Sequence, residues 1–108
     1  MTPEQLYGLA ADKRVEAAGL EGTAGRLRSI AATIRGSLAD IPAMSRRVWE
    51  GPAADQLEDE AATRSAAVDA QADSMVQAAA ELEARARVLR SDAARLDGEA
   101  LGMGAAFP

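Results

Sequence analysis

The chain is predicted to be all-α: an antiparallel two-helix hairpin that dimerises into a four-helix bundle. Apolar residues recur at alternating steps of three and four along two long segments, which is the spacing of one helix face. Aromatic residues make up 3% of the chain and alanine is abundant, a composition that favours helix over sheet. A run of turn-forming residues separates the two segments near the midpoint of the 108 residues.

The first helix is expected over about residues 3–39. Thr2 can cap it, Pro3 suits its first turn, and Gln5 follows Thr2 by three residues, as in a capping box. Its apolar stripe, interrupted only by Lys13, consists of Leu6, Ala10, Lys13, Ala17, Leu20, Ala24, Leu27, Ala31, Ile34 and Leu38. Glycines within this segment each cost roughly 1 kcal/mol relative to alanine, but the stripe persists through them.

Pro42 leaves two alternatives for the following residues. Proline removes one backbone hydrogen bond and disfavours helical angles at Ile41. Because Ile41, Met44 and Val48 keep the helical spacing, a kinked helix can resume and run to residue 48. The alternative is a loop over residues 40–51.

The turn is expected at residues 49–51, where Trp49-Glu50-Gly51 precedes Pro52. Glycine adopts backbone angles that other residues resist, and proline is suited to the first position of a helix. Trp49 is the only tryptophan. Two roles are open to Trp49: its large apolar side chain fills the end of the hairpin, or a partner protein recognises it.

The second helix is expected over about residues 52–97, because neither glycine nor proline occurs between Pro52 and Gly98. A glycine-containing flexible tail is expected over residues 98–108. The stripe of this helix consists of Ala61, Ser65, Val68, Ala72, Met75, Ala79, Leu82, Ala86, Leu89, Ala93, Leu96 and Ala100. Further apolar residues lie beside the stripe and widen the apolar face of the helix. A wide face of this kind is expected where a helix has a second contact surface. The candidates for a partner interface are Val68, Met75, Val76, Leu82, Val88 and Leu89.

Composition excludes several classes of function. The net charge of −5 argues against a nucleic-acid partner, which requires a basic surface. The chain has no Cys and no His, so thiol chemistry is impossible and the usual proton shuttle is missing. We therefore expect no enzyme, no cofactor and no metal. No segment approaches the roughly 18 apolar residues of a membrane span, so stable membrane insertion is not expected, nor is a cleavable signal peptide.

With a central Trp49-Glu50-Gly51, two long flanking helices, small residues at Ala53 and Ala54 before Leu57, and a length near one hundred residues, the chain resembles the WXG family of small type VII secretion substrates, also called ESAT-like proteins. The resemblance spans nearly the whole chain. It implies a hairpin that dimerises with itself or with a related WXG-type hairpin and leaves the cell folded, through a membrane-embedded export ATPase.

The resemblance also implies that Trp49 and Gly51 form the turn half of a secretion signal. The family's other half, a C-terminal Tyr-x-x-x-Asp/Glu element, has no counterpart in residues 98–108, which contain no tyrosine. Either a partner supplies it or the chain is a divergent member with another role. The protein is then expected in the cytoplasm before export and afterwards secreted or in the cell envelope. The alternative is an adaptor or chaperone-like helical partner of a larger exported toxin. A single lysine among many arginines and alanines, with the resemblance, suggests an actinobacterial source.

Overall fold

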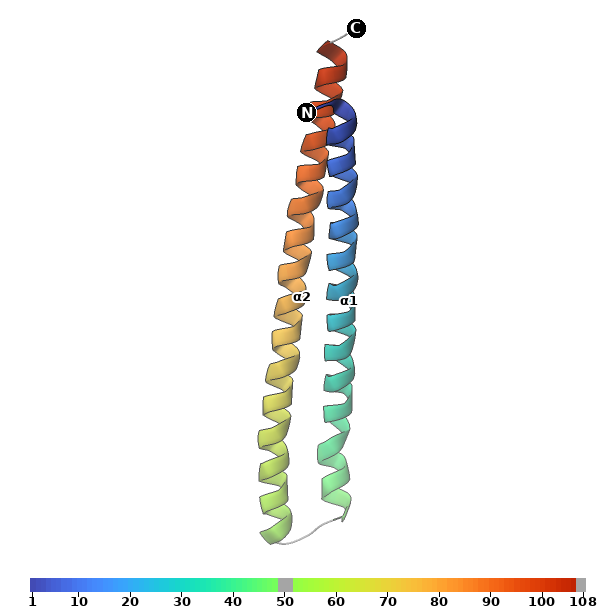
Figure 1. The fold of residues 1–108 in the computed structure, drawn as a ribbon. Helices are drawn as coiled ribbons and strands as arrows, with labels where there is room; N and C mark the ends of the chain where they lie inside the picture. Colours follow the sequence, from blue (N-terminus) through green and yellow to red (C-terminus); the bar gives the residue numbers. More distant parts are fainter. Residues whose placement is uncertain (49–51, 107–108) are drawn as a thin grey trace. The chain divides into compact units, whose positions relative to one another are not determined.

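In the computed structural model the chain forms two long α-helices, α1 (Pro3–Val48) and α2 (Pro52–Ala106), which lie antiparallel as a hairpin (Figure 1). The structure describes the backbone of residues 1–48 and 52–106, and the side chains of residues 1–37 and 55–103. The predicted all-α hairpin is confirmed, whereas its pairing with a second hairpin stays a prediction. The expected turn at residues 49–51, with Trp49 and Gly51, lies outside the described residues.

The hairpin divides into two compact units, each of which contains a length of both helices. Unit one consists of residues 1–25 and 79–108, and unit two of residues 26–78. Within each unit α1 packs against α2. The two units are described separately below.

The N-terminus of α1 is closed by the expected capping box. The backbone N–H of Gln5 donates to Oγ1 of Thr2 at 3.2 Å, and the backbone N–H of Thr2 donates to Oε1 of Gln5 at 2.9 Å. Two N–H groups that have no partner within a helix are thereby satisfied. Glu4 in the first turn further suits the positive end of the helix dipole.

α1 continues through Pro42 to Val48. The alternative of a loop beginning at residue 40 is therefore wrong as far as residue 48. Proline lacks one N–H donor, but helical residues continue on both sides of Pro42.

α2 is longer than expected, because it extends beyond residue 97 to Ala106. The prediction of a flexible tail from Gly98 is wrong up to that residue. Ala100 is buried with Leu6, Ala10, Ala93 and Leu96 in one apolar cluster, against which Met103 packs. This packing continues the four-and-three spacing and offsets the roughly 1 kcal/mol that each glycine costs in a helix.

Alanines at every seventh position form the centre of the helix contact. We call them the alanine row: Ala10, Ala17, Ala24 and Ala31 in α1, and Ala72, Ala79, Ala86, Ala93 and Ala100 in α2. Each is at most 1% exposed. Because a methyl group occupies little space, two helices that meet at alanines can approach closely. We therefore expect a larger side chain in the alanine row to strain the contact between the two helices.

Larger side chains alternate with the alanines and complete the spacing. This large-residue row consists of Leu6, Lys13, Leu20, Leu27 and Ile34 in α1, and Val68, Met75, Leu82, Leu89, Leu96 and Met103 in α2. Only Leu6 and Leu96 are buried, and the others are partly buried. The predicted stripes are thus confirmed wherever side chains are described, but a single neighbouring helix leaves most of the large-residue row incompletely covered.

Candidate partner interface

The two sides of the helix pair differ in chemistry. In an antiparallel pair, the row next to the alanines on one helix lies opposite the same row on the other, where opposite charges can form salt bridges. We call the row four positions after each alanine the charged flank. The large-residue row, together with the apolar members of the row three positions after it (Leu9, Ile30 and Ala78), forms the opposite side, which we call the apolar flank. The other described members of that second row, among them Glu16, Asp92 and Glu99, are polar or charged.

In unit one, two ion pairs across the helices close the charged flank. Nε of Arg90 in α2 donates to Oε1 of Glu21 in α1 at 2.6 Å. Arg14 of α1 likewise binds Asp97 of α2. The hydrogen bond from Arg90, aided by its positive charge, holds the pKa of the Glu21 carboxyl below its ordinary value. Glu21 in turn raises the pKa of Arg90.

In unit two, Arg35 makes the same kind of closure. Its Nε atom lies 3.1 Å from Oδ1 of Asp69, and its Nη2 atom binds Asp73 one helical turn further along α2. These partners remain partly or largely exposed to solvent, so each pair contributes little to the free energy of unfolding. Their effect is rather to fix how α1 and α2 align and to cover the alanines on this side.

The apolar flank of unit one remains open. Leu20 of α1 and Leu82 and Leu89 of α2 are partly buried, and Leu9 is 39% exposed. The one polar member of the large-residue row, Lys13, is held here by a 3.9 Å contact with Asp92 of α2.

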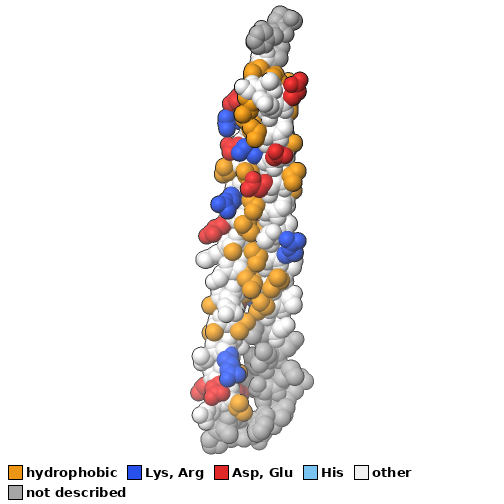
Figure 2. All heavy atoms as spheres, viewed as in Figure 1, with side chains coloured by type: hydrophobic (Ala, Val, Ile, Leu, Met, Phe, Trp, Pro, Cys, Tyr) orange, Lys and Arg blue, Asp and Glu red, His pale blue; other side chains and the backbone are white. Residues whose placement is uncertain are grey.

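The apolar flank of unit two has the same character. Its members are Leu27, Ile30, Ile34, Val68, Met75 and Ala78. All are partly buried except Ile30, which is 49% exposed. On the face shown in Figure 2, hydrophobic side chains follow the line between the two helices, with charged side chains beside them.

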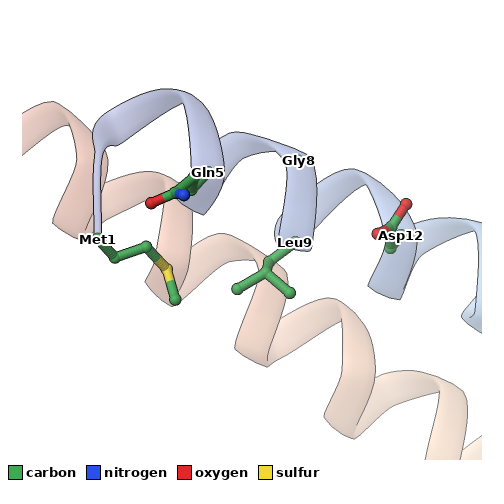
Figure 3. A pocket seen from close by; sticks show the side chains of 5 residues that line it. All are labelled: Met1, Gln5, Gly8, Leu9 and Asp12. Carbon is green, nitrogen blue, oxygen red and sulfur yellow. The ribbon is translucent and has the colours of Figure 1, made fainter.

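An open hollow lies at the N-terminal end of the chain, in unit one, where it includes Leu9 of the apolar flank. It is lined by Met1, Gln5, Gly8, Leu9 and Asp12. Figure 3 shows the side chains of Met1 and Leu9 extending to the same side, with Asp12 directed away from them. Gly8 has no side chain to fill the space between. A shallow apolar hollow of this kind suits a side chain of a docked protein better than a small molecule, which needs a more enclosed cavity.

The structure separates the six interface candidates. Val68, Met75, Leu82 and Leu89 belong to the large-residue row and lie on the apolar flank of their respective units. Val76 is partly buried but lies four positions after Ala72, on the charged flank. Val88 is 60% exposed and belongs to neither flank. Trp49 and Gly51, the candidate signal residues, lie outside the described residues.

Sequence reasoning missed three contributors to the apolar flank: Leu9 and Ile30 in α1, and Ala78 in α2. Each follows a large-residue position (Leu6, Leu27 or Met75) by three residues, and this spacing was the signal available in the sequence. It also missed that ion pairs connect the two helices. Within α2, Arg95 also pairs with Glu99 one turn further along the helix, at 2.8 Å.

The fold and the two flanks together define a helical hairpin with one closed side and one open apolar side. Within the described part of the chain, neither helix combines the length and hydropathy needed to cross a membrane. No protein-family model, curated protein or solved structure matches the chain.

Proposed function

We propose that the protein is a non-enzymatic WXG-type hairpin that a type VII secretion system exports folded, together with a partner hairpin. Outside the cell it acts as an effector or as the partner of one. The observation that carries the proposal is the position of the triplet Trp49-Glu50-Gly51, which occupies the three residues between the end of α1 at Val48 and the start of α2 at Pro52.

The need for a partner hairpin is supported by the open apolar flank. A chain of 108 residues can bury only part of its apolar surface by itself. Here the apolar members of the large-residue row other than the buried Leu6 and Leu96 are covered by one helix each and remain partly exposed. A second pair of helices would complete their burial in a four-helix bundle.

A binding role, not a catalytic one, is supported by the residue types available. The sequence contains no Cys and no His, which removes the commonest nucleophile–base pairs. Carboxylates near the start of α2 are accounted for by the helix dipole. Residues 98–108 contain no tyrosine, and in this proposal a partner supplies the second half of the secretion signal.

Export can be tested in the source organism by immunoblotting culture supernatant and cell lysate, with and without the gene for the export ATPase. The proposal expects the protein in the supernatant only when the ATPase is present. Trp49→Ala should retain the protein in the lysate, whereas Trp49→Phe should reduce export less. Wild-type protein confined to the lysate, or found in the supernatant without the ATPase, would contradict the proposal.

A further inference from the structure

Both packing rows of the hairpin repeat at intervals of seven residues, so packing alone does not select one alignment of the two helices. The alanine row has the same small side chain at each repeat, and the large-residue row has an apolar side chain at every repeat except Lys13. If α2 slipped along α1 by seven residues, or about 10 Å, each row would again meet the same kinds of residue. Packing therefore distinguishes the native alignment from the slipped one only by the burial lost at the helix ends.

The charges on the charged flank of unit one follow a longer repeat, because their sign alternates. Seven residues separate Arg14 from Glu21 in α1. At the same spacing, α2 carries Glu83, Arg90 and Asp97. Each of the two α1 charges meets an opposite charge, since Arg14 binds Asp97 and Glu21 accepts a hydrogen bond from Arg90 at 2.6 Å. The charge pattern thus repeats every fourteen residues, which is twice the period of the packing.

A slip of seven residues in either direction would bring like charges together. In a slip toward earlier α2 residues, Arg14 would lie opposite Arg90. In the same slip, Glu21 would lie opposite Glu83, and in the reverse slip it would lie opposite Asp97. Like charges that face each other across a helix pair repel, and such repulsion excludes wrong alignments. A slip of fourteen residues would restore opposite signs, but it would uncover two repeats of each apolar stripe.

Two further contacts oppose the slip toward earlier α2 residues. Lys13 in unit one lies 3.9 Å from Asp92, and the slip would place it opposite Arg85 instead. In unit two, Arg35 binds two aspartates of α2. The positions that would replace these aspartates, 62 and 66, are alanines. The displacement is therefore unfavourable in each unit considered by itself.

We propose that the alternating charges of the charged flank select the native alignment of α1 and α2 by penalising a slip of seven residues. Exposed ion pairs add little to the free energy of unfolding. They affect the choice of alignment more strongly, because a slip both removes an attraction and adds a repulsion. Glu83, which is partly buried, thereby acts through the repulsion from Glu21 in the slipped hairpin. This role concerns the two helices of one chain and requires neither export nor a partner.

The test exchanges two charges within α2, in the variant Glu83→Arg/Arg90→Glu. The exchange keeps the composition and the net charge. It places like charges at positions 21 and 90 in the native alignment, and it makes both pairs opposite in the slip toward earlier α2 residues. The matched control, Glu81→Arg/Arg87→Glu, exchanges the same residue types at exposed positions of the same helix.

Double electron–electron resonance can measure the alignment, because the chain has no Cys and nitroxide labels attach only to cysteines introduced for them. Labels at the exposed positions of Ala18 and Ala94 move apart in the slip toward earlier α2 residues, whereas labels at those of Ala11 and Ala80 approach. An excess of unlabelled protein restricts the measurement to distances within one chain, and circular dichroism monitors helix content.

We expect one distance for each label pair in the wild type and in the control. In the exchange variant we expect a second population, longer for the first label pair and shorter for the second. Adding Glu21→Arg to the exchange should remove this population, because opposite charges then meet again at positions 21 and 90. Should the exchange lose its helix content, Arg90→Glu alone serves as a second variant with the same expected directions.

A single wild-type distance for each label pair in the folded exchange variant would overturn the proposal. So would a second population in the control, since the effect would then not depend on the charged flank. Lengthening of both label pairs would also contradict it, because that result indicates separation of the helices and not a slip.

Discussion

Arg90 and Glu21 join the two helices of unit one across the charged flank, with Nε of Arg90 lying 2.6 Å from Oε1 of Glu21. The contact links residues separated by 69 positions, and the pair Arg14–Asp97 nearby links residues separated by 83. Because the separation falls as α1 proceeds, the helices run antiparallel. The charged flank therefore fixes the alignment that leaves the leucines on the opposite side.

The first prediction concerns the pKa of Glu21, which the hydrogen bond from Arg90 lowers. A carboxyl whose pKa is lower in the folded state contributes stability at pH values above its ordinary pKa. That contribution disappears as the pH falls through the lowered value. In Arg90→Gln, a carbon-detected NMR titration should show the pKa of Glu21 rising toward the ordinary glutamate value. An unchanged pKa would show that the contact does not persist in solution.

The second prediction tests the close approach of the helices at the alanine row. Ala86 is 1% exposed, so Ala86→Leu forces additional methylene groups into a packed contact. It should lower the free energy of unfolding by about 1–3 kcal/mol. Ala84→Leu, on the exposed face of the same helix, should change it by less than about 0.5 kcal/mol. Urea unfolding at one fixed protein concentration measures both, and equal effects would refute a tight alanine contact.

The third prediction concerns Gly22, an exposed residue within α1. A Cβ atom built there would meet no described atom within 4 Å. Gly22→Ala should therefore stabilise the hairpin by about 0.5–1 kcal/mol, because alanine has the higher helix propensity. Thermal unfolding measures the gain, and the dimer Kd should not change. A weaker dimer would instead show that the face of α1 that carries Gly22 takes part in the interface.

The fourth prediction tests the helical extension beyond residue 97. Met103 packs against the buried cluster of Leu6 and Leu96, whereas the neighbouring Leu101 is 65% exposed. Met103→Ala should lower the free energy of unfolding by about 1–2 kcal/mol, less than for a fully buried methionine. Leu101→Ala should be nearly neutral. A flexible segment in solution would make both substitutions neutral in chemical denaturation.

Periodicity was sufficient to predict the fold class and the buried face. Ala10, Ala17 and Ala24 recur at intervals of seven, and this regular spacing identifies one helix face without any structure. The spacing of Thr2 and Gln5 also predicted a capping box, and the two hydrogen bonds between these residues confirm it.

The ends of the helices and the two flanks could not be predicted in the same way. Gly98 suggested a stop, but the packing of Ala100 and Met103 against α1 outweighs the glycine cost, and tertiary contacts of this kind are not visible in local sequence. Likewise, Val76 and Met75 are adjacent in sequence. Only the pairing of α1 with α2 shows that they belong to opposite flanks.

The most direct test of the account is the native mass of the unmodified protein at micromolar concentration, measured alone and with the product of its neighbouring gene. The account predicts a folded complex of two hairpins, either a dimer of 11.2 kDa chains or a one-to-one complex with that product. A fully helical monomer of 11.2 kDa in both samples would show that the leucines on the apolar flank remain in water and would contradict the account.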